Sequence, residues 1–197
     1  EAVFDLSFYQ SNPLPFVSLA KEIWPGMTYS PTLSHSFISL LSSKKLLLRN
    51  YTQNIDGLEL LSGVDESKIV ECHGHFRTAS CIACGVPYDG KKCRDEIVDS
   101  VVPTCPKCGC LVKPDIVFFG ESLPVRFKNL LHSDLGSCDL LIVMGTSLKV
   151  APVSLIPEMV NSRTPRVLMN RELVGDFVPP GVEGNYRDVF QEGDCDD

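Results

Sequence analysis

Apolar side chains recur along the chain with two different periods. Between 14 and 23 and between 33 and 41 they fall three or four positions apart, the period of a helix with one buried face. Short continuous apolar runs predict strands buried on both faces, at 46–51, 69–72, 115–119, 139–144 and 166–169. Further helices are predicted between these strands, at 57–61, 124–135 and 152–160. The alternation predicts an α/β fold in which helices cover both faces of a parallel sheet.

Proline marks the boundaries of the first helices. Asn12 and Pro13 are typical of an N-cap and of the first helical position, and Pro25-Gly26 is expected to end this helix. Ser30-Pro31 repeats the start signal before the second helix. We therefore expect residues 1–45 to form a helical segment.

Two stretches do not show the alternation of helices and strands. Residues 171–197 contain Pro179-Pro180-Gly181 and an acidic end, and are expected to be mostly loop. Residues 76–112 are rich in cysteine, glycine, proline and charge and show little periodicity. This second stretch is therefore predicted to be an insert that is stabilised by its own cross-link.

Four cysteines in the insert are spaced as metal ligands. Cys81-x-x-Cys84 and Cys105-x-x-Cys108 form two pairs, and each second cysteine is followed by a glycine, Gly85 or Gly109. Glycine suits the tight turn in which backbone N–H groups face the thiolates. Four thiolates fill a tetrahedral zinc shell and leave no open position, so we predict one structural zinc ion in a zinc-ribbon module at 76–112.

The insert also offers alternatives. Cys110 is a competing ligand, but Cys108 fits the two-residue spacing better, and Cys93 has no partner at ligand spacing. The pairs could instead form a disulfide, and a zinc ribbon could be a nucleic-acid reader. Acidic residues interrupt the basic ones, which predicts a mixed solvated surface without direct nucleic-acid contact. The basic residues are Lys91, Lys92 and Arg94, and the acidic residues are Asp89, Asp95, Glu96 and Asp99.

Composition narrows the class of protein. The chain has 197 residues and a formal net charge of −7, which argues against a duplex-DNA binder and is compatible with basic peptide partners. No apolar run approaches the roughly 18 residues of a membrane span, so we expect no membrane partner. Nine cysteines, an odd number that includes the two Cys-x-x-Cys pairs, favour a reducing compartment and an intracellular protein.

Polar residues follow two of the predicted strands. The segment from Thr52 to Gly57 comes after the run at 46–51, and His73-Gly74 ends the run at 69–72. Open α/β sheets bind ligands just past the ends of their strands. An amide pair, a carboxylate and a histidine supply hydrogen bonds, charge and a proton acceptor that titrates near neutrality. Taken alone, Asp56 could equally be a helix N-cap, and His73 a packed or capping histidine.

Four motifs carry a family resemblance. They are Thr-Gln-Asn-Ile-Asp-Gly-Leu-Glu at 52–59, Val-Glu-Cys-His-Gly at 70–74, Lys-Pro-Asp-Ile-Val-Phe-Phe-Gly-Glu at 113–121 and Gly-Thr-Ser-Leu at 145–148. In this order, and with the cysteine pattern, they resemble the sirtuins, which are NAD-dependent protein-lysine deacylases. The branch with the cytosolic and mitochondrial eukaryotic deacetylases is the most similar. The resemblance implies a Rossmann-like NAD-binding domain at 46–75 and 113–197, beside the helical segment at 1–45 and the zinc module at 76–112.

The resemblance also implies a reaction. The acyl group of a protein lysine would pass to the ADP-ribose part of NAD, which gives nicotinamide, O-acyl-ADP-ribose and the free lysine. His73 would act as general base on a ribose hydroxyl, with His75 as its nearest rival. Asn54 and Asp56 would position the nicotinamide ribose and carboxamide, Ile55 would pack on the nicotinamide ring, and Gln53 would bond the ribose. Further NAD contacts are implied at Gly145, Thr146, Ser147, Asn170, Glu172 and Cys195.

A substrate site follows from the same resemblance. Val117, Phe118 and Phe119 resemble the acyl-lysine tunnel, although alternating side chains point to opposite faces, so one phenylalanine is expected to line it. The peptide would pair as a strand with Gly120-Glu121 and with the loop near Val150. Backbone pairing has little sequence selectivity, so the implied partners are acylated-lysine proteins or peptides, with histone tails or other basic segments among them.

Two parts of the sirtuin pattern have no counterpart in this sequence. They are the glycine-rich segment that holds the phosphates and the last helix. We therefore expect an NAD-binding domain that is incomplete at its N-terminus and binds NAD weakly. Three hypotheses follow: a deacylase, an inactive fragment that acts as a zinc-containing protein-binding module, and a protein ADP-ribosyltransferase. The sequence does not distinguish cytoplasm, nucleus and mitochondrion.

Overall fold

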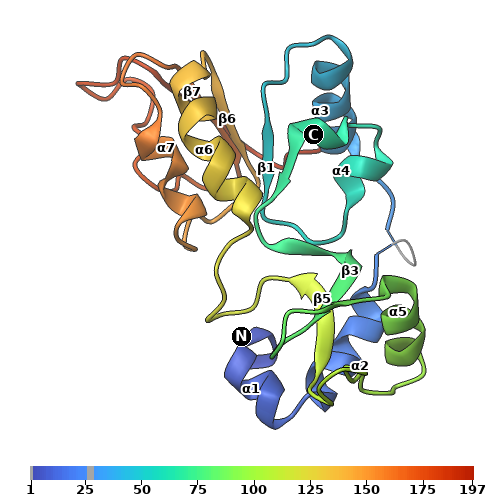
Figure 1. Cartoon of the computed structure of the whole chain (residues 1–197). Coiled ribbons are helices and arrows are strands. Elements are labelled where there is room, and N and C mark those ends of the chain that lie inside the picture. Colours follow the sequence, from blue (N-terminus) through green and yellow to red (C-terminus); the bar gives the residue numbers. More distant parts are fainter. Residues whose placement is uncertain (1, 26–28) are drawn as a thin grey trace.

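Two parallel sheets form one half of the molecule, the upper part of Figure 1. The computed structural model describes residues 2–25 and 29–197. β1 (Asn50–Thr52) pairs in parallel with β2 (Ile69–Glu71). β6 (Leu141–Met144), β7 (Arg166–Asn170) and β8 (Asp188–Glu192) form the second parallel sheet, in that order. The predicted α/β class with parallel strands is confirmed.

Helices pack against these sheets. The set comprises α3 (Leu33–Ser43), α4 (Leu58–Leu61), η2 (Glu66–Lys68), α6 (Val125–Ser137), η3 (Val153–Leu155) and α7 (Ile156–Met159). Val70 and Cys72 of the β2 segment are fully buried against Phe127 and Leu135 of α6. The same core reaches Val153 and Ile156, so α6, η3 and α7 share one apolar contact surface.

An antiparallel sheet forms the other half, the lower part of Figure 1. Its strands are β3 (Gly74–Cys81), β4 (Pro87–Tyr88) and β5 (Val112–Ile116), in the order β4-β3-β5. η1 (Ala2–Phe4), α1 (Leu6–Ser11), α2 (Leu14–Ile23) and α5 (Gly90–Val98) surround it. Tyr9, Phe16 and Phe118 meet edge to face in its core, with ring centroids 5.0 to 5.6 Å apart. The first two helices therefore pack with the insert.

The predicted helix starts are shifted by one or two residues. Pro13, not Asn12, is the N-cap of α2, and Thr32 caps α3 through a reciprocal pair of hydrogen bonds with His35. The predicted stop at Pro25-Gly26 lies partly outside the described residues, since Gly26 is not among them. Helix ends are the least fixed part of a sequence-based prediction, because several residues near an end can supply the cap.

The strand predicted at 46–51 begins only at Asn50. The backbone N–H groups of Leu46 and Leu47 both donate to the carbonyl of Leu41, so this apolar run finishes the turn after α3. Lys45 has a left-handed φ of 59°, as residues that terminate helices often do. Leu46 is 72% exposed, so the apolar run is not a buried strand at that end.

Other elements differ from the predictions in position or were not predicted. The strand expected at 115–119 lies at 112–116 as β5 and pairs with β3 in the antiparallel sheet. Residues 171–197, expected to be mostly loop, contain β8. The insert, expected to lack periodicity, contains α5, whose N-cap Asp89 accepts from the Lys92 N–H at 2.7 Å. No helix in the described part of the chain is long and apolar enough to cross a membrane.

Candidate functional site

The predicted NAD contacts all lie at the carboxyl ends of the parallel strands. Gln53 directly follows β1, and Gly145 directly follows β6. The catalytic candidate His73 lies two residues after the end of β2. Asn170 ends β7, and Cys195 comes three residues after β8. Because the strands run parallel within each sheet, these positions share one edge of their sheet, where such folds bind ligands.

A side-chain hydrogen bond joins the two parallel sheets at this edge. Gln53 Nε2 donates to Thr146 Oγ1 at 3.2 Å. The same oxygen accepts from the backbone N–H of Leu148 at 3.2 Å. Thr146 therefore ties the loop after β6 to the loop after β1.

The His73 imidazole is oriented by the backbone of the neighbouring loop. Its Nδ1 lies 3.0 Å from the carbonyl oxygen of Gln53. A carbonyl only accepts, so Nδ1 carries the hydrogen, and in the neutral ring Nε2 is left as an acceptor. His73 is half-buried, so part of the residue remains accessible to solvent.

The loop after β1 is shaped by short-range hydrogen bonds. The Asn54 N–H donates to buried Thr52 Oγ1 at 3.1 Å, and Asp56 Oδ1 accepts from the Leu58 N–H at 3.1 Å. Gly57 has a φ of 69° between Asp56 and α4. Asn54 is exposed, and Ile55 is half-buried against the core of the lower half. The N-cap of α4 is therefore Gly57 and not Asp56, which precedes it and accepts from the first residue of the helix.

A second set of contacts surrounds the end of β6. Gly145 has a φ of 58°, and a Cβ built there would lie 3.5 Å from Cys195 Sγ. Cys195 Sγ donates to the Met169 carbonyl at 3.3 Å, and the Gly193 N–H donates to the Asn170 carbonyl at 3.1 Å. Asn170 Nδ2 donates to the Glu172 carbonyl at 2.8 Å. The structure therefore gathers these predicted contacts, while Ser147 and the Glu172 side chain face solvent.

The predicted substrate residues divide between core and surface. Phe118 is 1% exposed and packs between Phe4, Tyr9 and Phe16. Phe119 is 52% exposed, and the Val117 N–H donates to the His73 carbonyl at 2.7 Å. Val150 is 40% exposed. The two phenylalanines therefore point to opposite sides, and Phe119 is the one on the open side.

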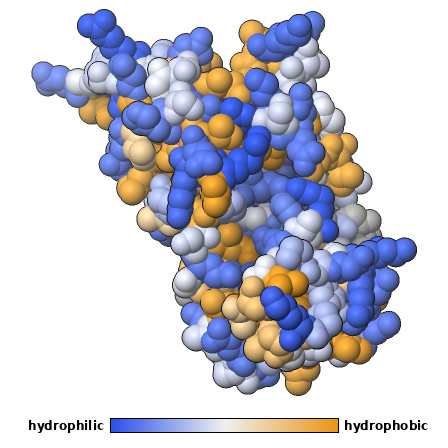
Figure 2. Space-filling view, viewed as in Figure 1, coloured by the Kyte–Doolittle hydropathy of each residue, from blue (hydrophilic) through white to orange (hydrophobic). Residues whose placement is uncertain are grey.

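A cleft of about 880 Å³ lies between the two halves. Its walls include Glu71, His75 and Arg77, and it reaches the predicted substrate residues Val117 and Glu121. It contains neither His73 nor Asn54. Figure 2 also shows a notch at the top of the view, between the part with α6 and α7 and the part with α3 and α4. Because the strand-end residues already converge through direct hydrogen bonds, we place the candidate NAD contacts with them, and the cleft adjoins this site only through the substrate residues Val117 and Glu121.

Burial shifts the pKa of two side chains next to His73, those of Cys72 and His75. Burial raises the pKa of Cys72, the neighbour of His73, to about 12. Burial also lowers the pKa of His75, and the nearby Arg77 lowers it further. His75 Nδ1 is buried and has no hydrogen-bond partner among the described residues. The neutral forms of both side chains are therefore favoured beside the site.

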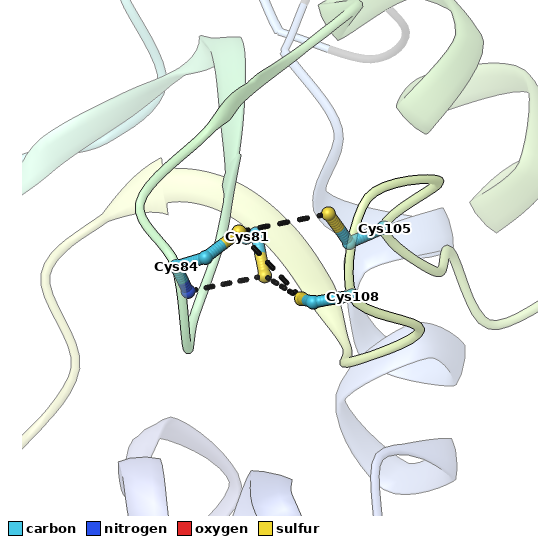
Figure 3. A group of neighbouring side chains, drawn as sticks. All are labelled: Cys81, Cys84, Cys105 and Cys108. Atoms are coloured by element: carbon cyan, nitrogen blue, oxygen red, sulfur yellow. Dashed lines mark hydrogen bonds between the residues drawn. The ribbon is translucent and has the colours of Figure 1, made fainter.

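The four predicted zinc ligands converge, as Figure 3 shows. Cys81 and Cys84 lie at the turn after β3, and Cys105 and Cys108 lie in the loop before β5. Their sulfur atoms all lie within 4.8 Å of one another, with contacts of 3.4 Å between Cys81 and Cys108 and 3.7 Å between Cys84 and Cys105. Zinc–sulfur bonds of ~2.3 Å in a tetrahedron separate sulfur atoms by ~3.8 Å. The cluster therefore fits a zinc ion.

The turns around these cysteines have the predicted shape. Gly85 and Gly109 have left-handed φ values of 65° and 73°. The Cys84 N–H points at Cys81 Sγ from 3.5 Å and lowers the pKa of the Cys81 thiol to about 6. A thiol with a lowered pKa is the better metal ligand. Cys110 lies outside the cluster, with its Sγ near the Cys108 carbonyl.

Three residues with key contacts were not singled out from the sequence. They are Thr52, buried Lys113, which pairs with Glu121, and Arg166, which is 2% exposed and bound to Asp188. A threonine that starts a motif could have been suspected of shaping its loop. A lysine between Val112 and Pro114 in an apolar run was the available signal for a buried charge.

Comparisons with known proteins show the family of this chain. The Sir2 family matches residues 1–152. The chain is 49% identical over 199 residues to NAD-dependent deacetylase sir2D of Dictyostelium discoideum, covering 100% of this chain and 35% of that protein. It is 50% identical over 195 residues to NAD-dependent protein deacetylase sirtuin-3 of Mus musculus, covering 98% and 57%.

A yeast relative gives a similar result. NAD-dependent protein deacetylase hst2 of Schizosaccharomyces pombe is 45% identical over 196 residues, covering 100% of this chain and 57% of that protein. The chain thus spans 35% to 57% of the length of these curated relatives. The family match covers more than half of the chain and includes the cysteine cluster and the residues around His73. The chain belongs to the Sir2 family, the sirtuins.

Proposed function

We propose that this chain carries most of the active site of an NAD-dependent protein-lysine deacylase. The observation behind the proposal is the convergence of Gln53, His73 and Thr146 at one edge of the parallel sheets. The named relatives are NAD-dependent deacetylases, which supports the same activity here. The products would be the free lysine, nicotinamide and O-acyl-ADP-ribose.

Each residue of the edge has a proposed task. When bound, NAD would supply the ADP-ribose that accepts the acyl group. His73 would take a proton at Nε2 from a ribose hydroxyl, because its Nδ1 is held by the Gln53 carbonyl. Asn54 and Asp56 would orient the nicotinamide ribose and carboxamide, with Ile55 against the ring. The remaining NAD contacts are proposed at Gln53, Gly145, Thr146, Ser147, Asn170, Glu172 and Cys195.

The substrate would enter beside Phe119. We assign the acyl-lysine stem to the side of Val117 and exposed Phe119, since Phe118 is occupied in the core. An extended peptide would pair with the backbone of Gly120-Glu121 and of the loop at Val150. Such pairing suits many acylated proteins, with basic segments such as histone tails among them and no direct nucleic-acid partner.

The domain division follows the proposed chemistry. We propose residues 46–75 and 113–197 as the NAD-binding domain, with the zinc module at 76–112 and the helical segment at 1–45. Support comes from the two parallel sheets, while β5 and the first two helices pack with the module. We further propose an intracellular location, because the four zinc-binding cysteines require a reducing environment.

Mass spectrometry of the reaction products tests this function. The zinc-loaded chain would be incubated with an acetyl-lysine peptide, with and without NAD. We expect O-acetyl-ADP-ribose and deacetylated peptide only when NAD is present. A peptide that gains ADP-ribose would instead identify an ADP-ribosyltransferase. A folded, zinc-loaded chain that gives no product would contradict the proposed activity for this chain and favour a protein-binding module.

A further inference from the structure

A tight turn presents the backbone that the substrate would contact. The Glu121 N–H donates to the Phe118 carbonyl at 3.0 Å, which closes a four-residue turn at 118–121. Gly120 is its third residue and has a φ of 95°, a conformation that favours glycine. Glu121 Oε2 also accepts from the Phe118 N–H at 2.7 Å. Glu121 therefore closes the turn through both its backbone and its side chain.

A buried lysine holds that glutamate. Lys113 Nζ lies 2.9 Å from Glu121 Oε2, 2.6 Å from the Ile116 carbonyl and 3.3 Å from the Pro114 carbonyl. An ammonium has three donors, and these three acceptors use all of them. Lys113 is 5% exposed, and its Nζ lies 4.6 Å from the centroid of the Phe118 ring. The turn is thus fixed from inside the molecule by a desolvated charge.

The other side of the turn is bound to the start of the chain. The Phe119 N–H donates to the Phe4 carbonyl at 2.7 Å, and the Leu6 N–H donates to the Phe119 carbonyl at 3.2 Å. Both backbone groups of Phe119 are therefore used within the chain. In the described part of the chain, the Gly120 N–H and the carbonyls of Gly120 and Glu121 have no backbone partner. These three groups form the open edge.

We infer that Lys113 is a positioning residue for substrate binding: through Glu121 it holds the turn at 118–121 so that Gly120 and Glu121 present their free backbone groups to an extended acyl-lysine peptide. The inference rests on the proposed deacylase function. Lys113 itself lies below the turn and does not touch the peptide. Its loss would leave Glu121 with one partner fewer and free the turn to change shape.

Binding and amide exchange together test this role. The affinity for a fluorescent acetyl-lysine peptide would be measured for the zinc-loaded wild type, Lys113→Met and Lys113→Arg. Lys128→Met, at an exposed position of α6, is the matched control. Hydrogen–deuterium exchange would report the amides of Phe118 and Glu121. We expect Lys113→Met to raise the Kd about tenfold, the weight of one charge-assisted hydrogen bond, and to speed exchange at both amides. Lys113→Arg should rescue most of both effects, and Lys128→Met should match the wild type.

The outcomes separate this inference from the proposed function. If the wild-type chain binds acetylated and unacetylated peptide equally well, both the proposed function and the role of Lys113 are contradicted. Wild-type preference with unchanged Kd and exchange in Lys113→Met would overturn the positioning role alone. If Lys113→Met loses zinc or its thermal transition, Glu121→Gln replaces it, because it removes the charge that Lys113 binds and keeps an oxygen acceptor. Glu121→Gln with wild-type affinity and exchange would likewise overturn the role.

Discussion

A single hydrogen bond decides which nitrogen of His73 can accept a proton. The Gln53 carbonyl accepts a hydrogen bond from Nδ1–H of His73. The side chain of the same glutamine donates to Thr146, in the loop after β6 of the other parallel sheet. His75 is two residues away, but its Nδ1 is buried without a partner among the described residues. The two histidines are therefore in different environments, and their variants should behave differently.

Replacing His73 tests its role as the base. His73→Ala should lower deacetylation by roughly a hundredfold or more, the usual weight of a general base, since no other group is held at that position. His75→Ala should keep most of the activity. Product formation by both variants would be measured at equal zinc content. Full turnover in His73→Ala would contradict the assignment.

The lowered pKa of His75 predicts a pH dependence of stability. Burial and Arg77 lower this pKa, against the opposing effect of Glu71 and Asp115. The folded chain therefore binds fewer protons than the unfolded chain near the ordinary histidine pKa of ~6.5. The stability that neutral His75 contributes is fully present above ~6.5 and is lost as the pH falls from there through the lower pKa of the folded chain. Urea unfolding of His75→Gln should show a flatter dependence between about pH 7 and 5 than the wild type.

Site residues could be predicted where a short stretch of sequence is enough to identify them. The zinc ligands follow from spacing within two short turns, whereas the N-cap of α4 proved to be Gly57 and not its neighbour Asp56. Lys113, Thr52 and Arg166 depend on partners that only the fold brings near, such as the Asp188 carboxylate on the next strand. Their roles could not be read from the sequence because a charged residue in an apolar run does not name its partner.

Among the elements, the zinc-binding turns connect the strands of the antiparallel sheet. Cys81 ends β3, and Cys105 and Cys108 precede β5, so one metal ion would join both strands. The buried core beside them includes Cys93, Ile97 and Val112 and continues into Tyr9 and Phe16 of the first two helices. A zinc ion would cross-link the two turns next to this core.

Removing one zinc ligand should unfold the insert. Cys81→Ser should lower the bound zinc from one equivalent to nearly none, because three thiolates bind the ion far more weakly. Zinc would be measured by elemental analysis of protein prepared without chelator. Cys110→Ser is the matched control and should keep one equivalent. Wild-type protein without zinc, or Cys81→Ser with a full equivalent, would contradict the zinc site.

Arg166 joins β7 to β8 and to α7. Its guanidinium binds both oxygens of Asp188 at 2.7 and 2.6 Å, Asp176 at 2.7 Å and the Pro157 carbonyl at 2.8 Å. Arg166→Met would leave the buried Asp188 carboxylate with only Arg187 at 3.9 Å as a cation, which should cost about 3 kcal/mol of folding free energy. Urea unfolding would measure the loss. Arg163→Met, at an exposed position, should change stability little, and equal stabilities would refute this account.

Elements with strong periodic patterns were predicted, and those with weak patterns were not. α2, α3, α6 and the strands β2, β6 and β7 lie close to their predicted positions. β8 was not predicted because Asp188 begins it and only two of its five residues are apolar. α1 was not predicted because it has six residues, although Asp5 caps it.

At the scale of the whole molecule, the candidate site lies where three parts meet. The loops after β1 and β2 and the loop after β6 come from the two parallel sheets. The turn at 118–121 is fixed to the N-terminal segment and to β5 of the other half. An acyl-lysine between this turn and His73 would thus contact both halves, which a sequence pattern alone could not reveal.

Hydrogen–deuterium exchange of the zinc-loaded chain, with NAD and an acetyl-lysine peptide added together, would locate the site that the two ligands occupy. We expect slower exchange at 53–57, at 73–75, at 145–148 and in the turn at 118–121. Protection confined to the cleft walls at Glu71, Arg77 and Asp115, or no protection at saturating ligand, would contradict a site built on the joined strand ends.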